Sequence, residues 1–290
     1  MADTIGFIGL GAMGAPMARN LLRKGVQLCV HDADSAKLAK LTQLGARSAD
    51  SPAAVARAAQ IIFTMLPDFA AVRDVMTGEG GLAQAQSTGL LLVNTSTVGP
   101  RWGKELAQLA RQHGMRLLEA PVTPGTHAAE AGTLNFFIAG DGADLQRVRP
   151  LLEAMGRRII FLGEHGRAQA LKMVNNSLSL CISALVAEAI ALGEKAGLPA
   201  DMLLDILSGT SADSYQLRQK LPRMIARDYS PGGSIDLAVK DLSVALEFAA
   251  QIGADMPLVR LTRDDYAAAS ARGQGPLDTS ALVEYYRSGQ

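Results

Sequence analysis

Near its N-terminus the chain reads Gly6-Phe7-Ile8-Gly9-Leu10-Gly11-Ala12-Met13-Gly14. These glycines follow a short apolar run typical of a buried strand and precede apolar residues spaced as on one face of a helix. In this setting Gly9 permits a tight turn, Gly11 lets the backbone approach a pyrophosphate, and Gly14 allows close packing of helix on strand. The helix N-terminus offers N–H groups to the phosphates. The stretch therefore predicts a dinucleotide-binding fold, and a plain strand–helix turn is the alternative. The predicted cofactor contacts are Gly9, Leu10, Gly11, Ala12, Met13 and Gly14.

An acidic residue, Asp32, follows the next apolar run and lies 18 residues after Gly14. At this place a carboxylate accepts hydrogen bonds from the ribose hydroxyls of adenosine and repels a 2′-phosphate, whereas an arginine favours the phosphate. The nearest cation that follows is Lys37. The sequence therefore predicts NAD rather than NADP. An ordinary surface aspartate is the alternative.

The composition narrows the class of protein. The 290 residues contain 28 basic and 28 acidic side chains, and this balance does not favour binding to nucleic acid or to an anionic membrane. Cys29 and Cys181 are far apart and lie in apolar stretches, as free thiols of a reducing compartment do. The first expected strand leaves no room for a signal peptide, and no stretch has the uninterrupted apolar length of a membrane span. We expect a cytoplasmic protein without a metal site.

Strand-like and helix-like segments alternate through the first half of the chain. The apolar strand-like runs lie at residues 59–67, 90–94, 116–120, 135–140 and 159–163. Strands separated by helices imply crossover connections and a largely parallel, doubly wound sheet, which we expect the last two runs to complete. One long helix is expected from about 166 to 196, with helical periodicity afterwards. The predicted fold class is α/β, with a Rossmann-type domain over 1–163 and an all-helical domain over 164–290.

The start of this long helix carries the first candidate for chemistry. Lys172, Asn175 and Asn176 are spaced i, i+3, i+4 and share a face. Two adjacent asparagines lower the helix propensity of a segment otherwise rich in good helix formers. A desolvated lysine can accept or donate the proton of a substrate hydroxyl, and the amides suit the same oxygen. A solvated helix face is the alternative on spacing alone.

A second candidate is the turn Thr123-Pro124-Gly125. It follows an expected strand and so should lie at the carboxyl edge of the sheet, where ligands bind in such folds. Its hydroxyl and backbone N–H groups suit a small carboxylate. Proline and glycine beside threonine are also ordinary turn residues. His127 in the same loop is either an acid/base group or a surface residue.

In combination, these motifs resemble those of the β-hydroxyacid dehydrogenases. The family's G-F-I-G-L-G-x-M-G-x-P-M-A pattern is matched at residues 6–18, and its D-A-P-V-S-G-G motif is echoed at 119–125. Its G-T-L is found at 132–134, its G-x-x-x-x-x-K-x-x-N-N pattern at 166–176 and its K-D-L at 240–242. The motifs occur in consistent order, and the likeness extends from residue 5 to about 285.

The resemblance implies an NAD-dependent oxidoreductase that interconverts a small 3-hydroxy acid and its semialdehyde. It implies that Lys172 is the catalytic acid/base and that Asn176 orients the substrate. Thr123 and Gly125, with Pro124 between them, would contact the acidic group of the substrate. Where the family has Ser-Gly-Gly, however, Pro124 removes a backbone N–H that could bind a carboxylate, so the substrate stays open.

The resemblance also implies the path of the cofactor and an assembly. Leu66, Pro67, Ser96 and Thr97 would line the ribose and pyrophosphate, and Lys240 would lie at the nicotinamide end. The helical domain would serve the substrate and join copies into a homodimer or homotetramer. The alternatives are an imine reductase, a class that shares the architecture but usually lacks the lysine, and a noncatalytic dinucleotide-binding protein.

Overall fold

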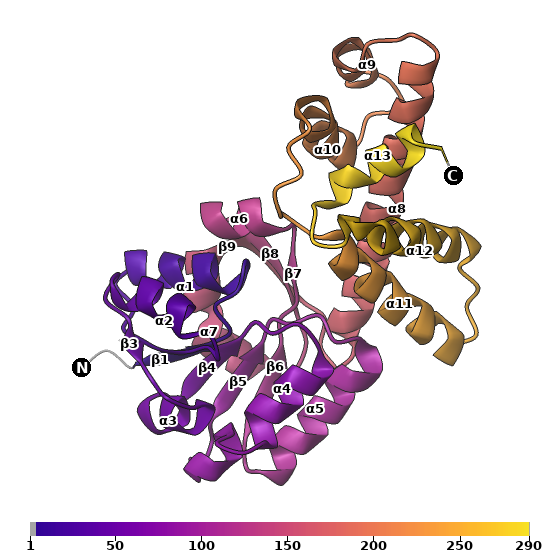
Figure 1. Ribbon diagram of the computed structural model, residues 1–290. Helices are drawn as coiled ribbons and strands as arrows, with labels where there is room; N and C mark the ends of the chain where they lie inside the picture. Colours follow the sequence, from indigo (N-terminus) through magenta and orange to yellow (C-terminus); the bar gives the residue numbers. More distant parts are fainter. Residues whose placement is uncertain (1–3, 290) are drawn as a thin grey trace. The chain divides into compact units, whose positions relative to one another are not determined.

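The computed structural model describes residues 4–289 and divides into two compact units, Met1–Lys172 and Met173–Gln290 (Figure 1). The first unit is α/β and the second is helical. This confirms the predicted fold class of a Rossmann-type domain followed by an all-helical one. The two units divide within one long helix, α8 (Arg167–Lys195).

The first unit is built on a six-stranded parallel sheet of order β3-β2-β1-β4-β5-β6. The order reverses beside β1, as in doubly wound folds that bind ligands at such a point. The strands are β1 (Ile5–Ile8), β2 (Leu28–His31), β3 (Arg47–Ser48), β4 (Ile61–Thr64), β5 (Leu91–Asn94) and β6 (Arg116–Glu119). The helices that cover the two faces are α1 (Gly14–Arg23), α2 (Ser35–Thr42), α3 (Pro52–Ala58), α4 (Phe69–Thr77), α5 (Pro100–Gln112) and α7 (Gly142–Met155).

Neighbouring residues of each strand enter two different cores, because successive side chains point to opposite faces of a sheet. Phe7 packs with residues of α1, α2 and α7, whereas Ile8 packs with residues of α3, α4 and α5. Both faces are therefore buried, which explains why the strands read as continuous apolar runs. The carboxylates of Asp34 and Asp68 and the hydroxyl of Ser51 each cap the first turn of a helix.

The last three strands of the unit form a separate sheet. In it β7 (Val122–Thr123) pairs antiparallel with β8 (Leu134–Ile138), which pairs parallel with β9 (Gly156–Phe161). The expectation that the last two apolar runs complete the main sheet is therefore wrong. The chain leaves β6 at Pro121, which has no N–H for a ladder, and a single bridge between Glu119 and Ala139 joins β6 to β8. Helix α6 (Thr126–Ala131) links β7 to β8.

The second unit contains the rest of α8 and five further α-helices around its own apolar core. Ile190 of α8, Leu221 of α10, Leu242 of α11 and Tyr266 of α12 are fully buried in this core. Helix α8 lies close to the helix expected between 166 and 196. The other helices are α9 (Ala200–Leu207), α10 (Tyr215–Ala226), α11 (Ile235–Gln251), α12 (Pro257–Ala269) and α13 (Leu282–Arg287).

Helix α8 also presents apolar side chains to the outside. Leu178, Leu185 and Leu192 are 61–70% exposed and lie seven residues apart, so they form one line along the helix, which we call the α8 stripe. Among residues 4–289, α8 is the one helix whose length and hydropathy would suffice to cross a membrane, a test that core helices of soluble proteins also pass. The sequence-based expectation concerns an uninterrupted apolar run, and Asn175, Asn176 and Glu188 interrupt the apolar sequence of α8.

Candidate active site

The carboxyl ends of five parallel strands lie in register at one edge of the main sheet. Ile8 pairs with both His31 and Thr64, Thr64 pairs with Asn94, and Asn94 pairs with Glu119. Residues that follow these strands are therefore neighbours in space. This edge brings together the glycine loop, Asp32, Leu66, Pro67, Ser96 and Thr97.

The glycine loop has the geometry that close approach of a phosphate requires. Gly9 has φ +92°, and a Cβ there would lie 2.2 Å from the carbonyl oxygen of Met65. A Cβ on Gly14 would lie 1.9 Å from the carbonyl oxygen of Gly9, so both positions require glycine. At Gly11 a Cβ would meet no described atom within 4 Å. The loop is thus open at the position expected to face the pyrophosphate, and its residues fit a dinucleotide.

Asp32 braces this loop. Its Oδ2 accepts a hydrogen bond from the N–H of Leu10 at 2.7 Å, and its Oδ1 accepts one from the N–H of Asp34 at 2.9 Å. A carboxylate has about four acceptor positions, so these bonds do not exhaust its capacity to bind a ribose hydroxyl. The Nζ of Lys37 lies 3.6 Å from Oδ1 of Asp32 and partly offsets the negative charge.

A hydrogen bond joins two of the loops that are expected along the cofactor path. The N–H of Leu66 donates to Oγ of Ser96 at 2.8 Å. Ser96 is fully buried, so its hydroxyl supports the Leu66–Pro67 turn from inside the unit. Pro67 is exposed and Thr97 is half-buried. Of the expected cofactor contacts in these loops, Pro67 is thus the most accessible to solvent and Ser96 the least.

Lys172 lies beside the Thr123–Gly125 turn. Its Nζ donates to the carbonyl oxygen of Val122 at 2.7 Å, and Val122 immediately precedes the turn. The lysine is 9% exposed, so its side chain is largely desolvated and does not belong to a solvated helix face. Thr123 and Pro124 are half-buried, the peptide bond between them is cis, and Gly125 is exposed. The first unit thus brings Lys172 of the first candidate beside the turn that forms the second.

In the second unit, Asn176 and Lys240 meet at a carboxylate that the sequence analysis does not single out. Asp241 is buried, and its Oδ2 accepts from Nδ2 of Asn176 at 2.7 Å. Its Oδ1 lies 2.9 Å from Nζ of Lys240. Nδ2 of Asn175 donates to Oδ1 of Asn176 at 3.2 Å, so the amide of Asn176 is oriented from both ends. The K-D-L motif was the available signal for Asp241.

Two fully buried polar residues of the first unit, Glu119 and Gln169, are also missed by the sequence-based prediction. Glu119 ends strand β6, and Gln169 lies one turn before Lys172 on α8. Each bonds to segments distant in the chain. A charged residue at the end of an apolar strand and an amide three residues before the lysine were the signals that could have found them.

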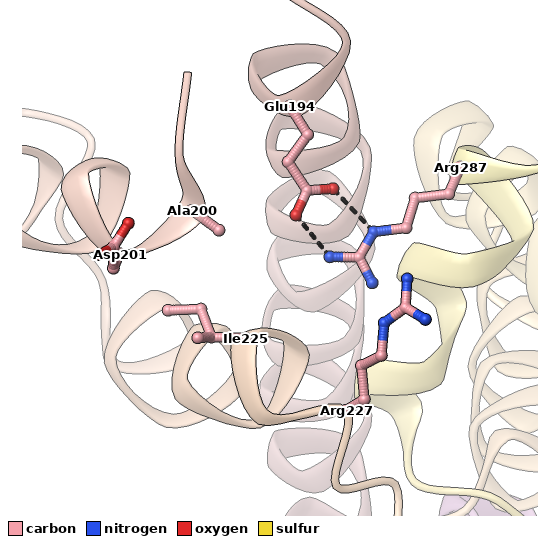
Figure 2. A pocket seen from close by; sticks show the side chains of 6 residues that line it. All are labelled: Glu194, Ala200, Asp201, Ile225, Arg227 and Arg287. Carbon is pink, nitrogen blue, oxygen red and sulfur yellow. Dashed lines mark hydrogen bonds and ion pairs between the residues drawn. The ribbon is translucent and has the colours of Figure 1, made fainter. Parts of the chain in front are cut away.

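A pocket of about 460 Å³ in the second unit contains none of the predicted site residues (Figure 2). Arg287 donates from Nε to Oε2 of Glu194 at 2.7 Å and from Nη1 to Oε1 of Glu284 at 2.7 Å, so its charge is compensated. The pocket is lined by Glu194, Ala200, Asp201, Ile225, Arg227 and Arg287.

Comparison with known proteins assigns both halves of the chain. Residues 4–163 match the family described as the NAD binding domain of 6-phosphogluconate dehydrogenase. Residues 166–286 match the family described as NAD-binding of NADP-dependent 3-hydroxyisobutyrate dehydrogenase. The 3-sulfolactaldehyde reductase of Escherichia coli K12 is 38% identical, over 98% of this chain and 95% of that protein. The chain belongs to the β-hydroxyacid dehydrogenase family.

Solved structures of similar proteins share the fold along the whole chain. The 3-hydroxyisobutyrate dehydrogenase of Mycobacterium tuberculosis, solved with L-serine, is 34% identical with a TM-score of 0.88, and the match covers 99% of this chain and 100% of that one. Psf3, solved with NADP⁺ and 2-OPP, is 28% identical with a TM-score of 0.90, covering 97% and 99% of the two chains. This β-hydroxyacid dehydrogenase is therefore an enzyme that uses a nicotinamide dinucleotide.

Proposed function

We propose that the enzyme transfers a hydride between NAD(H) and a small 3-hydroxy acid or its semialdehyde, with Lys172 as the general acid/base. The observation that carries this proposal is the Nζ of Lys172, held 2.7 Å from the carbonyl oxygen of Val122 beside the Thr123–Gly125 turn. The same compact unit holds the glycine loop and Asp32. When bound, the nicotinamide supplies the hydride acceptor for oxidation or the hydride donor for reduction.

Lys172 moves the proton that accompanies the hydride. In oxidation its neutral amine accepts the proton of the substrate hydroxyl as the carbon loses its hydride. In reduction its ammonium donates a proton to the carbonyl oxygen, which becomes the hydroxyl. The bond to the oxygen of Val122 holds Nζ in one place beside the turn. General acid/base catalysis by a group placed in this way contributes about 10²–10⁴-fold to the rate.

We infer that Thr123 and Gly125 bind the acidic group of the substrate and that Asn176 orients it. A threonine hydroxyl and a backbone N–H both donate to a carboxylate, and such charge-assisted bonds are strong. Pro124 contributes no N–H, so this turn offers one donor fewer than a Ser-Gly-Gly turn would.

A coupled activity panel tests the proposal. Hydroxyisobutyrate, glycerate, serine, threonate and sulfonate analogues are offered with NAD, and the matching semialdehydes with NADH, with NADP(H) in parallel. We expect NAD reduction with at least one hydroxy acid. Reduction of cyclic imines without turnover of any hydroxy acid or semialdehyde would contradict the proposal and favour an imine reductase.

We also propose that the enzyme is a cytoplasmic homodimer or homotetramer joined through its helical unit. The α8 stripe is exposed, and α9 has no buried residue although Met202 and Ile206 are apolar. Exposed apolar surface of this extent is typical of a protein interface. Cys29 and Cys181 are both free thiols, as in proteins of reducing compartments. Light scattering on the purified protein gives the number of copies.

A further inference from the structure

The side chain of Gln169 crosses from α8 to the loop that follows β5. Its Oε1 accepts from the N–H groups of Val98 at 3.1 Å and Gly99 at 3.2 Å, and its Nε2 donates to the carbonyl oxygen of Ser96 at 2.9 Å. These three partners fix the orientation of the amide, because two are donors and one is an acceptor. One fully buried side chain thus satisfies three backbone groups of the loop that contains the proposed cofactor residues.

Glu119 attaches the first turn of α8 to the end of β6. Its Oε1 accepts from the N–H of Gly166 at 2.6 Å, and its Oε2 accepts from the N–H of Gln169 at 3.4 Å. Nδ1 of His165 lies 3.6 Å from Oε1. Unpaired N–H groups and the dipole of a helix N-terminus stabilise a buried anion at this place. Gly103 leaves room for it, since a Cβ there would lie 2.5 Å from Oε1 of Glu119 and 3.3 Å from Cγ of Gln169.

These contacts fix α8 one turn before Lys172. Gln169 and Lys172 are three residues apart and share a helix face. Glu119 and Val122, which accepts from Lys172, belong to the same short segment. The start of α8 is therefore tied to this segment twice, once through its backbone and once through the lysine side chain.

We propose that Gln169 and Glu119 are positioning residues that hold the Ser96–Gly99 loop and Lys172 in one fixed arrangement. The proton-transfer group and the loop expected to carry the cofactor then keep their relative places through the reaction. This inference rests on the proposed function of Lys172. It adds two residues whose effect on turnover is exerted through other groups.

The test must separate positioning from plain stabilisation, and Asn20 offers a matched control. Its buried amide donates from Nδ2 to the carbonyl oxygen of Ala129 at 2.7 Å and joins α1 to α6 in the same unit. Asn20 is part of no proposed site. Gln169→Met and Asn20→Leu each replace a buried amide by an apolar side chain of similar size, so both should lower the Tm.

The measurements are the NADH Kd by fluorescence, the single-turnover rate of hydride transfer and hydrogen exchange at the amides of Val98 and Gly99. For Gln169→Met we expect faster exchange at both amides, a higher NADH Kd and a rate lowered about tenfold or more, because a displacement of about 1 Å can cost roughly 100-fold. Asn20→Leu should change none of the three. The proposal would be overturned if Gln169→Met and Asn20→Leu had the same rate of hydride transfer, the same NADH Kd and the same exchange pattern.

A second variant guards against failure of Gln169→Met to fold. Gly103→Ala removes no polar group but pushes a methyl against Glu119 and Gln169, so we expect the same pattern with smaller changes. A parental rate and parental exchange in this variant would count against the proposal. Lys172→Ala separates the proposed acid/base role of Lys172 from the proposed positioning role of Gln169 and Glu119. If Lys172→Ala keeps the parental rate of hydride transfer, the proposed function fails. Hydrogen exchange at Val98 and Gly99 and the NADH Kd of Gln169→Met would still decide whether Gln169 orders the loop.

Discussion

At the scale of single residues, Lys172 is notable because it is buried and bonded to a backbone oxygen. We predict that Lys172→Ala lowers kcat by about 10²-fold or more, the usual scale for a general acid/base, and leaves the NADH Kd within about twofold. Lys195 of the same helix also donates to a backbone oxygen, that of Tyr286 at 3.1 Å. Lys195→Ala is thus the matched control and should keep kcat. Steady-state kinetics with the true substrate would refute the role of Lys172 if its variant stayed within about threefold of the parent.

Asp32 accepts a hydrogen bond from the glycine loop and places a negative charge near the expected ribose, and different substitutions can separate these two effects. We predict that the parent binds NADH at least about tenfold more tightly than NADPH, which corresponds to about 1.4 kcal/mol. Asp32→Asn keeps an acceptor for the N–H of Leu10 while it removes the charge, so it should narrow this ratio mainly by improving NADPH binding. Asp32→Ala also removes the acceptor and should weaken both cofactors.

The cation beside Asp32 tests the same electrostatic argument from the other side. Lys37→Ala should widen the preference for NADH, because Lys37 offsets the carboxylate charge. Lys40 on the same helix, for which the structure describes no ion pair with Asp32, is the control. Fluorescence titrations with both cofactors measure the ratios. Equal affinities of the parent for NADH and NADPH would show that Asp32 does not face the ribose.

The sequence reveals residues whose signal is local and misses those whose partners are distant. The glycine spacing and Asp32 could be read because a short turn and the next strand bring them together. Glu119, Gln169 and Asp241 could not be assigned roles, since their partners lie 47–73 residues away in the chain. Nothing in a single sequence tells which buried amide meets which loop.

At the scale of elements, the same limit applies to strands. The apolar runs at 135–140 and 159–163 do form strands, β8 and β9. Periodicity indicates that a run is buried and extended, but it does not indicate which strand lies beside it. The partner is set by the chain reversal at α6, which lies between β7 and β8, so that β8 returns antiparallel to β7 and to the end of β6. The helical crossovers account for the parallel direction of the six main strands, whereas their order does not follow from periodicity.

The α8 stripe leads to a prediction about assembly. If the proposed oligomer forms through this stripe, Leu185→Glu should dissociate it, since the substitution places like charges opposite each other or buries a carboxylate without a partner. Leu185 is 63% exposed and lies in the middle of the stripe. Leu44 of the first unit is 55% exposed, so Leu44→Glu is a matched control that should leave the assembly unchanged. Sedimentation velocity reports the outcome, and an unchanged coefficient for Leu185→Glu would show that α8 is not at the interface.

At the scale of the whole molecule, stability in acid should depend on Asp278. Burial raises the pKa of this carboxyl, but the ammonium of Lys220 at 2.8 Å and the bonds from Ser280 outweigh it, so the pKa is held below its usual value. A depressed pKa in the folded state means that the contribution is present above about pH 4 and is lost as the pH falls through the folded value.

We therefore predict that Asp278→Asn lowers the free energy of unfolding by about 3 kcal/mol at neutral pH and flattens its decline below about pH 4. The pair of Asp255 and Arg260 is exposed, so Asp255→Asn should have an effect below about 1 kcal/mol. Urea unfolding followed by circular dichroism between neutral pH and pH 3 gives both quantities. An Asp278→Asn variant with the parental decline in acid would contradict the assignment.

The division of the chain inside α8 has a consequence for recombination between relatives. The two family matches meet between residues 163 and 166, yet Glu119 and the Ser96–Gly99 loop depend on groups from Gly166 and Gln169. A crossover placed where the matches meet would join the first unit of one parent to the start of α8 from another parent. The buried carboxylate of Glu119 and three backbone groups of the Ser96–Gly99 loop would then need hydrogen-bond partners from that other parent. A crossover after Lys172 keeps these contacts within one parent. We expect viable chimaeras of this family to take residues 166–172 from the same parent as the rest of the first unit.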